Sequence, residues 1–159
     1  MEAVVEHVSE YELSRGKPIP TLNHAVVQGN LIFALKLHYR QQYTILSELN
    51  LSMPERPDTV PDVAIYPKLT IDFFNDVTAM TEMPLTVIEI VSPSQGDAEI
   101  IAKFRRYFEA GVQSCWLVMP SFQAISVYSE FGKYRFFTSA DTLTDPVTNI
   151  ELALSDIFQ

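Results

Sequence analysis

One carboxylate stands in the middle of an otherwise apolar, β-branched segment. Glu89 is flanked by Val87 and Ile88 on one side and by Ile90 and Val91 on the other. Such a segment is typical of a central strand covered on both faces, where an isolated carboxylate would lose its hydration at a cost of several kcal/mol. Glu89 must therefore be paired, protonated or bound to a metal ion. The alternative is an ordinary glutamate that reaches solvent or a backbone group near a strand end.

A second acid, Asp62, lies near the start of a shorter apolar strand that the sequence predicts from Val60 to Tyr66. If this strand is the antiparallel neighbour of the strand predicted from Leu85 to Val91, the carboxylates of Asp62 and Glu89 can lie close together. Paired carboxylates suit a hard cation such as Mg²⁺, which keeps several waters and takes one or two protein carboxylates. Pro57-Asp58 is a similar dipeptide, but it lies in a predicted loop and is expected to be a chance repeat.

Lys103 is an amine that can join these acids. In the helix predicted from Asp97 to Ala110, Lys103 lies just outside the edge of an apolar stripe, next to Tyr107. From there its ammonium group can reach the end of the sheet. The alternative is an ordinary i,i+4 ion pair with Glu99 on an exposed helix, worth a few tenths of a kcal/mol.

Charge restricts the possible partners. The chain has 20 acidic and 11 basic residues and a formal net charge of −9 at pH 7. A field of this sign repels polyanions and favours metal cations, so binding to DNA would need a local basic patch. The densest positive cluster is Lys103, Arg105 and Arg106, which could meet phosphate groups. The alternative is that these side chains form a plain solvated helix face.

Length and composition indicate one domain covering residues 1–159. A chain of 159 residues with 47% apolar residues is typical of a globular domain. No apolar run approaches the roughly 20 residues that cross a bilayer, and the N-terminus lacks the features of a signal peptide, so we expect a cytoplasmic protein without membrane contact. The single cysteine, Cys115, excludes an intramolecular disulfide, and three widely spaced histidines exclude a structural zinc site.

The remaining pattern predicts an α+β (α/β) fold in which two helices flank a mixed central β-sheet. One helix is expected from Leu22 to Tyr39, on the spacing of apolar residues that include Val26 and Phe33. The other helix, Asp97 to Ala110, is expected to begin with a capping box formed by Ser94 and Asp97 and to end at Gly111.

Six strands, a lead-in element and a closing element complete this prediction. The strands are expected at Thr44–Met53, Val60–Tyr66, Leu85–Val91, Ser114–Met119, Ala124–Glu130 and Lys133–Thr138. A lead-in element and a turn are expected from Val4 to Pro20, and a short strand or helical turn after Asn149.

The order of these segments closely resembles the Uma-two family, whose members are bacterial, especially cyanobacterial, proteins classed as endonucleases of the PD-(D/E)XK superfamily. The resemblance covers nearly the whole chain, and no single motif in it is specific alone. It is carried by Val60-Pro61-Asp62-Val63, Thr86-Val87-Ile88-Glu89-Ile90-Val91-Ser92-Pro93-Ser94, Asp97, Lys103, Tyr107-Phe108-Glu109-Ala110-Gly111-Val112 and Cys115-Trp116-Leu117-Val118.

The resemblance implies a restriction endonuclease-like fold and metal-dependent hydrolysis of DNA. Asp62 and Glu89 match the two acids of the motif, and with the carbonyl group of Ile90 they would hold Mg²⁺ or Mn²⁺. The superfamily pattern places a lysine two positions after the second acid, where this chain has Val91. Lys103 lies where members of the family carry a lysine on the helix, and it resembles a replacement for the missing one.

Three further residues match the family as accessory groups: Asp97, His24 and Glu48. A position at a helix N-terminus is by itself a sufficient structural reason for Asp97.

The competing interpretation is a nuclease-like fold that serves as a binding or assembly module without turnover. In that case the chain could form a homodimer through the aromatic residues of its late strands, Tyr128, Tyr134, Phe136 and Phe137. For at least half of these aromatic side chains we expect packing in the core instead.

Overall fold

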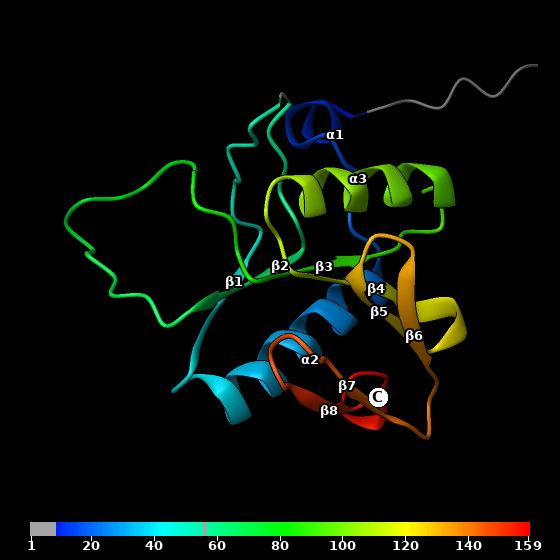
Figure 1. Ribbon diagram of the computed structural model, residues 1–159. Coiled ribbons are helices and arrows are strands. Elements are labelled where there is room, and N and C mark those ends of the chain that lie inside the picture. The colour runs from blue at the N-terminus through cyan, green and yellow to red at the C-terminus, as the bar shows by residue number, and fades with distance from the viewer. Residues whose placement is uncertain (1–8, 56) are drawn as a thin grey trace, which may run out of the picture.

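A six-stranded mixed sheet separates two apolar layers (Figure 1). The computed structural model describes residues 9–55 and 57–159. The strands follow one another across the sheet in chain order, and every neighbouring pair is antiparallel except β3 and β4, which are parallel. The strands are β1 (Tyr43–Ser47), β2 (Val63–Pro67), β3 (Thr86–Ile90), β4 (Ser114–Met119), β5 (Ala124–Glu130) and β6 (Lys133–Phe137). The predicted mixed central sheet is confirmed.

Helix α3 (Asp97–Glu109) makes the crossover that the parallel pair of β3 and β4 requires. The predicted capping box of Ser94 and Asp97 is wrong. The N-cap is Gly96, which has no side chain to cap the helix, and Asp97 is the first helical residue, where its charge complements the helix dipole. After the helix, Gly111 adopts a positive φ of 107°, as its predicted position at the helix end requires.

Helix α2 (Leu22–Tyr39) lies on the opposite side of the sheet from α3 and has the predicted bounds (Figure 1). Its first turn is capped by the hydroxyl of Thr21, which accepts a hydrogen bond from the amide of His24. The apolar spacing that predicted the helix, however, includes its outer side: Val26 and Phe33 are exposed. The face that packs on the sheet is made of other residues, namely His24, Val27, Leu31, Ala34 and Leu35.

Each face of the sheet supports its own apolar cluster. On the α2 side, Ile88 and Ile90 of β3 pack with Trp116. On the α3 side, Val87 of the same strand packs with Phe104 and other residues of α3. The alternation of β3 therefore directs Glu89 to the α3 side, together with Val87, as its position in the strand predicts.

The remaining elements of the fold are short. Helix α1 (Glu10–Arg15) begins with a capping box between Ser9 and Glu12; residues 4–8 of the predicted lead-in lie outside the described residues. A two-stranded sheet and two short 3₁₀ helices complete the fold: β7 (Thr142–Thr144), β8 (Glu151–Ala153), η1 (Pro120–Phe122) and η2 (Leu154–Asp156). Of these, β7, β8 and η2 contribute Leu143, Leu152 and Leu154 to the apolar cluster on the α2 side. No helix of the described residues has both the length and the apolar composition to span a bilayer.

Two predicted strand boundaries differ from the structure in a way that shapes the site. Strand β1 ends at Ser47 because Glu48 adopts a left-handed conformation with φ of 51°, which turns the chain out of the strand direction. The amide of Glu48 then donates to the carbonyl group of Asp62. Strand β2 begins at Val63 rather than Val60, so Asp62 lies immediately before the strand.

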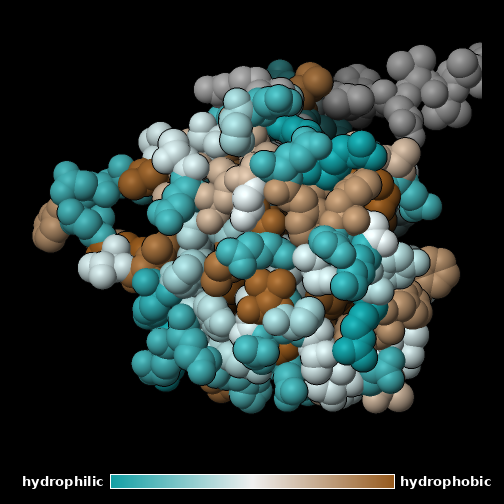
Figure 2. Space-filling model, viewed as in Figure 1, coloured by the Kyte–Doolittle hydropathy of each residue, from teal (hydrophilic) through white to brown (hydrophobic). Residues whose placement is uncertain are grey.

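The connection between β2 and β3 is a long irregular loop that extends away from the sheet (Figure 1). In Figure 2 its polar and apolar side chains stand clear of the body of the molecule. Phe73 and Phe74 of this loop are almost fully exposed.

The late aromatic residues divide evenly between the core and the surface. Tyr128 and Phe137 are buried, whereas Tyr134 and Phe136 are more than half exposed. Core packing thus accounts for two of the four, as expected for strands with one covered face.

A buried carboxylate, Asp145, connects the sheet to the loop before β8. Its Oδ2 atom accepts hydrogen bonds from the hydroxyl of Ser114 at 2.7 Å and from Nε1 of Trp116 at 2.8 Å, and its Oδ1 atom accepts one from the amide of Val147. Ser114 also shares a hydrogen bond with Thr86 of β3. The carboxylate therefore satisfies polar groups that the core would otherwise bury unpaired.

Replacing Asp145 by Ala is expected to lower the free energy of unfolding by about 2–4 kcal/mol, because Trp116 and Ser114 lose their acceptor inside the core. Chemical denaturation measures this change. Asp156→Ala removes an exposed carboxylate and should change the free energy of unfolding by less than about 0.5 kcal/mol. Equal effects of the two substitutions would contradict the structural role of Asp145.

Candidate functional site

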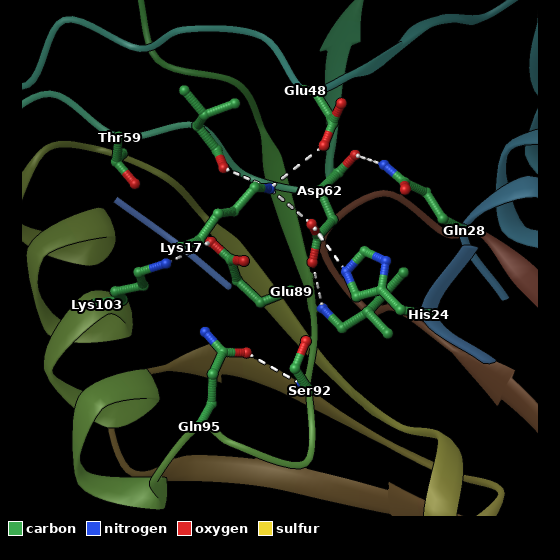
Figure 3. Close-up of polar contacts among 12 residues, drawn as sticks. Lys17, His24, Gln28, Glu48, Thr59, Asp62, Glu89, Ser92, Gln95 and Lys103 are labelled. Atoms are coloured by element: carbon green, nitrogen blue, oxygen red, sulfur yellow. Dashed lines mark hydrogen bonds and ion pairs between the residues drawn. The ribbon is translucent and has the colours of Figure 1, made fainter. Parts of the chain in front are cut away.

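Asp62, Glu89 and Lys103 converge at one end of the central sheet (Figure 3). The pairing of β2 with β3 places Val63 opposite Ile88, so one position further along Asp62 comes opposite Glu89. Both carboxylates are almost completely buried, with exposed fractions of 1% and 2%. The antiparallel pairing that the sequence analysis set as the condition for the two acids to meet is therefore present, and it brings them together.

Asp62 is held by donors from three separate segments. Its Oδ1 atom accepts a hydrogen bond from Nζ of Lys17 at 2.7 Å and lies 3.2 Å from Nε2 of His24. Its Oδ2 atom accepts a hydrogen bond from the amide of Ile90 at 2.7 Å. Its own carbonyl group accepts one from the side chain of Gln28. Helix α2, strand β3 and the turn that follows α1 thus each supply a donor that fixes this one carboxylate.

Glu89 is held from the side of helix α3. The hydroxyl of Tyr107 donates a hydrogen bond to its Oε1 atom at 2.8 Å, and Nζ of Lys103 lies 3.8 Å from the same oxygen. The Tyr107 hydroxyl also shares a hydrogen bond with Thr59. Lys103 and Tyr107 are four residues apart and face the same side of α3, which is why both reach the sheet at one point. Lys103 therefore forms its ion pair with Glu89, and the alternative pair with Glu99 is not among the described ion pairs.

Lys17 is a site residue to which the sequence analysis assigned no role. Its side chain is 8% exposed, and its ammonium group contacts Asp62, lies 3.7 Å from Oε1 of Glu48, and donates to the carbonyl group of Val60. It follows Gly16, whose φ of 67° turns the chain from α1 toward the sheet. Lysine is almost never buried without a partner, and the partners of Lys17 are distant in sequence, so no local pattern indicates its burial.

The three predicted accessory residues occupy different places. His24 and Glu48 belong to the cluster, His24 through Asp62 and Glu48 through Lys17. Asp97 is exposed in the first turn of α3 and takes part in none of the contacts around the two acids. The structure thus brings two of the accessory residues to the site and leaves Asp97 in its role at the helix N-terminus.

The basic residues of α3 do not form one patch. Lys103 reaches Glu89, Arg105 stacks on the ring of Phe131 at 4.6 Å, and Arg106 donates to the carbonyl groups of Glu55 and Pro57. Arg105 is two positions from Lys103 and therefore lies on another side of the helix, and Arg106 is held by the carbonyl groups of the loop before β2. The predicted patch of three cations is therefore divided among three separate contacts.

The two acids have opposite shifts in pKa. Burial alone would raise the pKa of Asp62, but the hydrogen bond from His24 and the positive charge of Lys17 together lower it below its usual value. For Glu89, burial dominates over the attraction of Lys103, and the nearby charge of Asp62 adds to it, raising the pKa to about 7. Burial and the neighbouring Glu89 also raise the pKa of Tyr107 well above its usual value. The metal-free site thus holds one ionised carboxylate and one that takes up a proton near neutral pH.

The chemistry of the donor set fits a hard cation. A cavity of about 10 Å³ is lined by Asp62, Glu89, Ile90 and Lys17, and this is about the volume that one water molecule needs. Within the described part of the chain, no group of three or more His, Cys, Asp or Glu side chains gathers around a common point. Mg²⁺ needs only one or two carboxylates because it keeps several waters. The ammonium group of Lys17 lies 2.7 Å from Oδ1 of Asp62, so a cation bound to Asp62 would lie close to this positive charge.

Comparisons with known proteins agree with this fold. The model of the Uma2 family, described as "Putative restriction endonuclease", matches residues 3–155. The crystal structure of a protein described as a putative nuclease belonging to DUF820, from Anabaena variabilis ATCC 29413, superimposes with a TM-score of 0.75 and 20% sequence identity, covering 89% of this chain and 83% of that one. No curated protein matches the chain.

The raised pKa of Glu89 makes stability depend on pH. Because the folded protein holds a proton on Glu89 that the unfolded chain releases near pH 4.5, the free energy of unfolding falls as the pH rises from about 4.5 to about 7. In Glu89→Gln the side chain cannot ionise, so the free energy of unfolding of this variant should not fall over this pH range for this reason. In EDTA, the wild type should lose roughly 2–3 kcal/mol relative to Glu89→Gln between pH 5 and pH 8.

Denaturant unfolding of both proteins across this pH range measures the difference. Asp62 contributes little there, because its pKa lies below its usual value and it stays ionised in both states. If wild type and Glu89→Gln lose stability in parallel, Glu89 has an ordinary pKa and burial does not control it.

Proposed function

Because this chain belongs to the Uma2 family, we propose that it is a nuclease that hydrolyses phosphodiester bonds of DNA with Mg²⁺ or Mn²⁺ held by Asp62 and Glu89. The observation that carries this proposal is the meeting of two buried carboxylates and a lysine at a water-sized cavity. Burial of these charges costs stability that a purely structural core would avoid. A charged cluster of this kind is therefore better explained by chemistry than by packing.

The residues that would hold the cation are Asp62, Glu89 and the carbonyl group of Ile90. A bound divalent cation lowers the pKa of a coordinated water and neutralises charge that develops on the phosphate. The contacts described for Glu89 both reach its Oε1 atom, which leaves Oε2 to face a cation. Because the pKa of Glu89 is raised to about 7 when no cation is present, binding of a cation near neutral pH would release a proton from the molecules in which Glu89 is protonated.

Lys103 would act on the substrate side of the site. Its ammonium group lies 3.8 Å from Glu89 and is only partly buried, with 15% of the side chain exposed. A point charge with three donors at this place can hold a phosphate oxygen or orient a water molecule. It would supply the positive charge that the superfamily pattern places two residues after the second acid, where this chain has Val91.

The acidic surface restricts how DNA can bind. With a net charge of −9 and the cations of α3 engaged in separate contacts, long-range attraction to DNA is weak. We expect binding to be strongest at low salt and to depend on the cation that the two acids would hold.

The alternative is a module that binds or assembles without turnover. Two observations favour it: Val91 replaces the expected lysine, and Lys17 already pairs with Asp62. A module of this kind would show neither thermal stabilisation by Mn²⁺ nor retention of DNA at low salt, whereas the nuclease would show both.

Asp62→Asn, Glu89→Gln and Lys103→Met should each reduce cleavage of DNA in Mg²⁺ or Mn²⁺ by roughly 100-fold or more, because each removes a group that would hold the cation or the transition-state charge. Cleavage of plasmid and single-stranded DNA, with calorimetric titration of Mn²⁺, measures the effect. Binding of Mn²⁺ should be lost in the first two variants and retained in Lys103→Met.

Glu109→Gln, which removes an exposed acid at the end of the same helix α3, is the matched control and should keep full activity. Activity that persists undiminished in Asp62→Asn and Glu89→Gln would exclude this site as the source of cleavage.

Lys17→Met tests the relation between the internal ammonium group and the cation. The substitution leaves Asp62 without its counter-charge, so in EDTA the free energy of unfolding should fall by about 3 kcal/mol. Mn²⁺ should then raise the melting temperature more than in the wild type, since no ammonium group competes for Asp62. Thermal unfolding with EDTA and with Mn²⁺ measures both effects.

Lys133→Met is the matched control, because its ion pair with Glu130 is exposed and worth little. A loss of the Mn²⁺ response in Lys17→Met, with the response retained in the wild type, would show that Lys17 supports the cation instead of competing with it.

A further inference from the structure

Helix α2 carries a second apolar face that nothing in the described chain covers. One side of this 18-residue helix packs on the sheet. On the other side, Leu22, Val26, Phe33 and Leu37 are exposed by 78%, 42%, 68% and 61%. We refer to these four residues as the outer stripe. Single exposed apolar residues are ordinary, but four large ones along one helix face are typical of an interaction surface.

The outer stripe has the same spacing when read in either direction. Val26 and Phe33 are equally far from the midpoint between Gly29 and Asn30, and so are Leu22 and Leu37. Two copies of α2 packed antiparallel around a two-fold axis at this midpoint would place Val26 opposite the partner's Phe33 and Leu22 opposite the partner's Leu37. A contact between identical patches is what a two-fold dimer requires.

Gly29, at the centre of the outer stripe, is not explained by packing within one chain. A Cβ atom added there would meet no atom within 4 Å, and glycine inside a helix costs about 1 kcal/mol relative to alanine. A glycine at a helix crossing instead lets a second backbone approach closely. Its position beside the two-fold midpoint is where two antiparallel helices come nearest.

The shape at the two ends of the stripe is also complementary. A hollow of about 300 Å³ lies at the N-terminal end, lined by Leu22, Val26, Ile157 and Phe158 among others. Large side chains are exposed at both ends: Leu22 beside the hollow, and Phe33 and Leu37 at the other end. The two-fold arrangement brings Phe33 and Leu37 of each copy to the hollow of the other.

Charge favours this face over the rest of the surface for contact between two copies. The chain has a net charge of −9, yet residues 13–47 contain no Asp or Glu. Two copies of an acidic protein repel each other where their acidic side chains meet. The outer stripe lies within the segment that has no acidic side chain, so this repulsion is weakest there. A partner with a strongly basic surface would gain no attraction from this face.

We propose that the outer stripe of α2 is a homodimer interface, with two α2 helices packed antiparallel across a two-fold axis at Gly29 and Asn30. A standard interface buries about 800 Å² per partner. The helix is about 27 Å long, so an interface of this size would also include the C-terminal segment at its hollow end. The opposite face of the same helix supplies His24 and Gln28 to Asp62. In the dimer, the helix that forms the interface of each copy would also contact Asp62 of its own candidate site from its other face.

Sedimentation velocity over a range of protein concentrations tests the proposal. The wild type should form a dimer, and Phe33→Glu should raise its dissociation constant by at least about 100-fold. Leu37→Glu should do the same and serves as a second variant if the first fails to fold. Phe136→Glu, on the exposed side of β6 where the late aromatic residues suggested another dimer surface, should leave the dimer intact.

A wild type that stays monomeric at all concentrations would overturn the proposal. So would a dimer that persists in both folded α2 variants, or one that only Phe136→Glu disrupts. None of these three results depends on whether the protein cleaves DNA.

Cysteine cross-linking tests the antiparallel arrangement directly. A mixture of Val26→Cys and Phe33→Cys proteins should form disulfide-linked dimers on oxidation, and Val26→Cys alone should form many fewer. The native Cys115 is buried and does not compete. Equal cross-linking of Val26→Cys with itself and with Phe33→Cys would overturn the two-fold antiparallel packing.

Discussion

Burial of the Asp62 carboxylate is the constraint on which the arrangement of this fold depends. An ionised carboxylate inside a protein is tolerated only when donors surround it, and here the donors come from parts of the chain that are far apart in sequence. Lys17 comes from the turn after α1, His24 from the first turn of α2, and the amide of Ile90 from the end of β3. Moving any of these elements would leave a buried charge unpaired.

The neighbouring acid has the opposite environment, and this difference gives the site its chemical character. Hydrogen-bond donors and positive charge lower the pKa of Asp62 and keep it ionised, whereas burial raises the pKa of Glu89 to about 7. Two adjacent carboxylates in different states share a lower total charge than two ionised ones. In the proposed function, a divalent cation would supply the charge that allows both carboxylates to ionise.

The periodicity of β3 and α3 made much of the site predictable from sequence. The alternation of the strand predicted which face Glu89 takes, and the helical spacing predicted that Lys103 can reach the sheet. The antiparallel pairing of β2 with β3 was only a condition of the sequence analysis, because alternation does not determine which strands are neighbours. The role of Lys17 could not be predicted, because its burial depends on Asp62 and Glu48, which lie over thirty residues away along the chain. The break at Glu48 and the cap at Gly96 also escaped prediction, since both are set by tertiary contacts and backbone conformation instead of by hydrophobic spacing.

The contact between Lys17 and Asp62 also bears on how the protein is assembled. The two residues are 45 positions apart, so during synthesis the lysine leaves the ribosome well before its acidic partner, and before the strand whose amide completes the arrangement. Contacts of such long sequence separation form late, after loop closure has brought the segments together. Folding of the N-terminal segment is thereby linked to completion of the sheet. A nascent chain that ends before β3 would contain Lys17 and Asp62 but would lack the Ile90 amide that completes the hydrogen bonds of the Asp62 carboxylate.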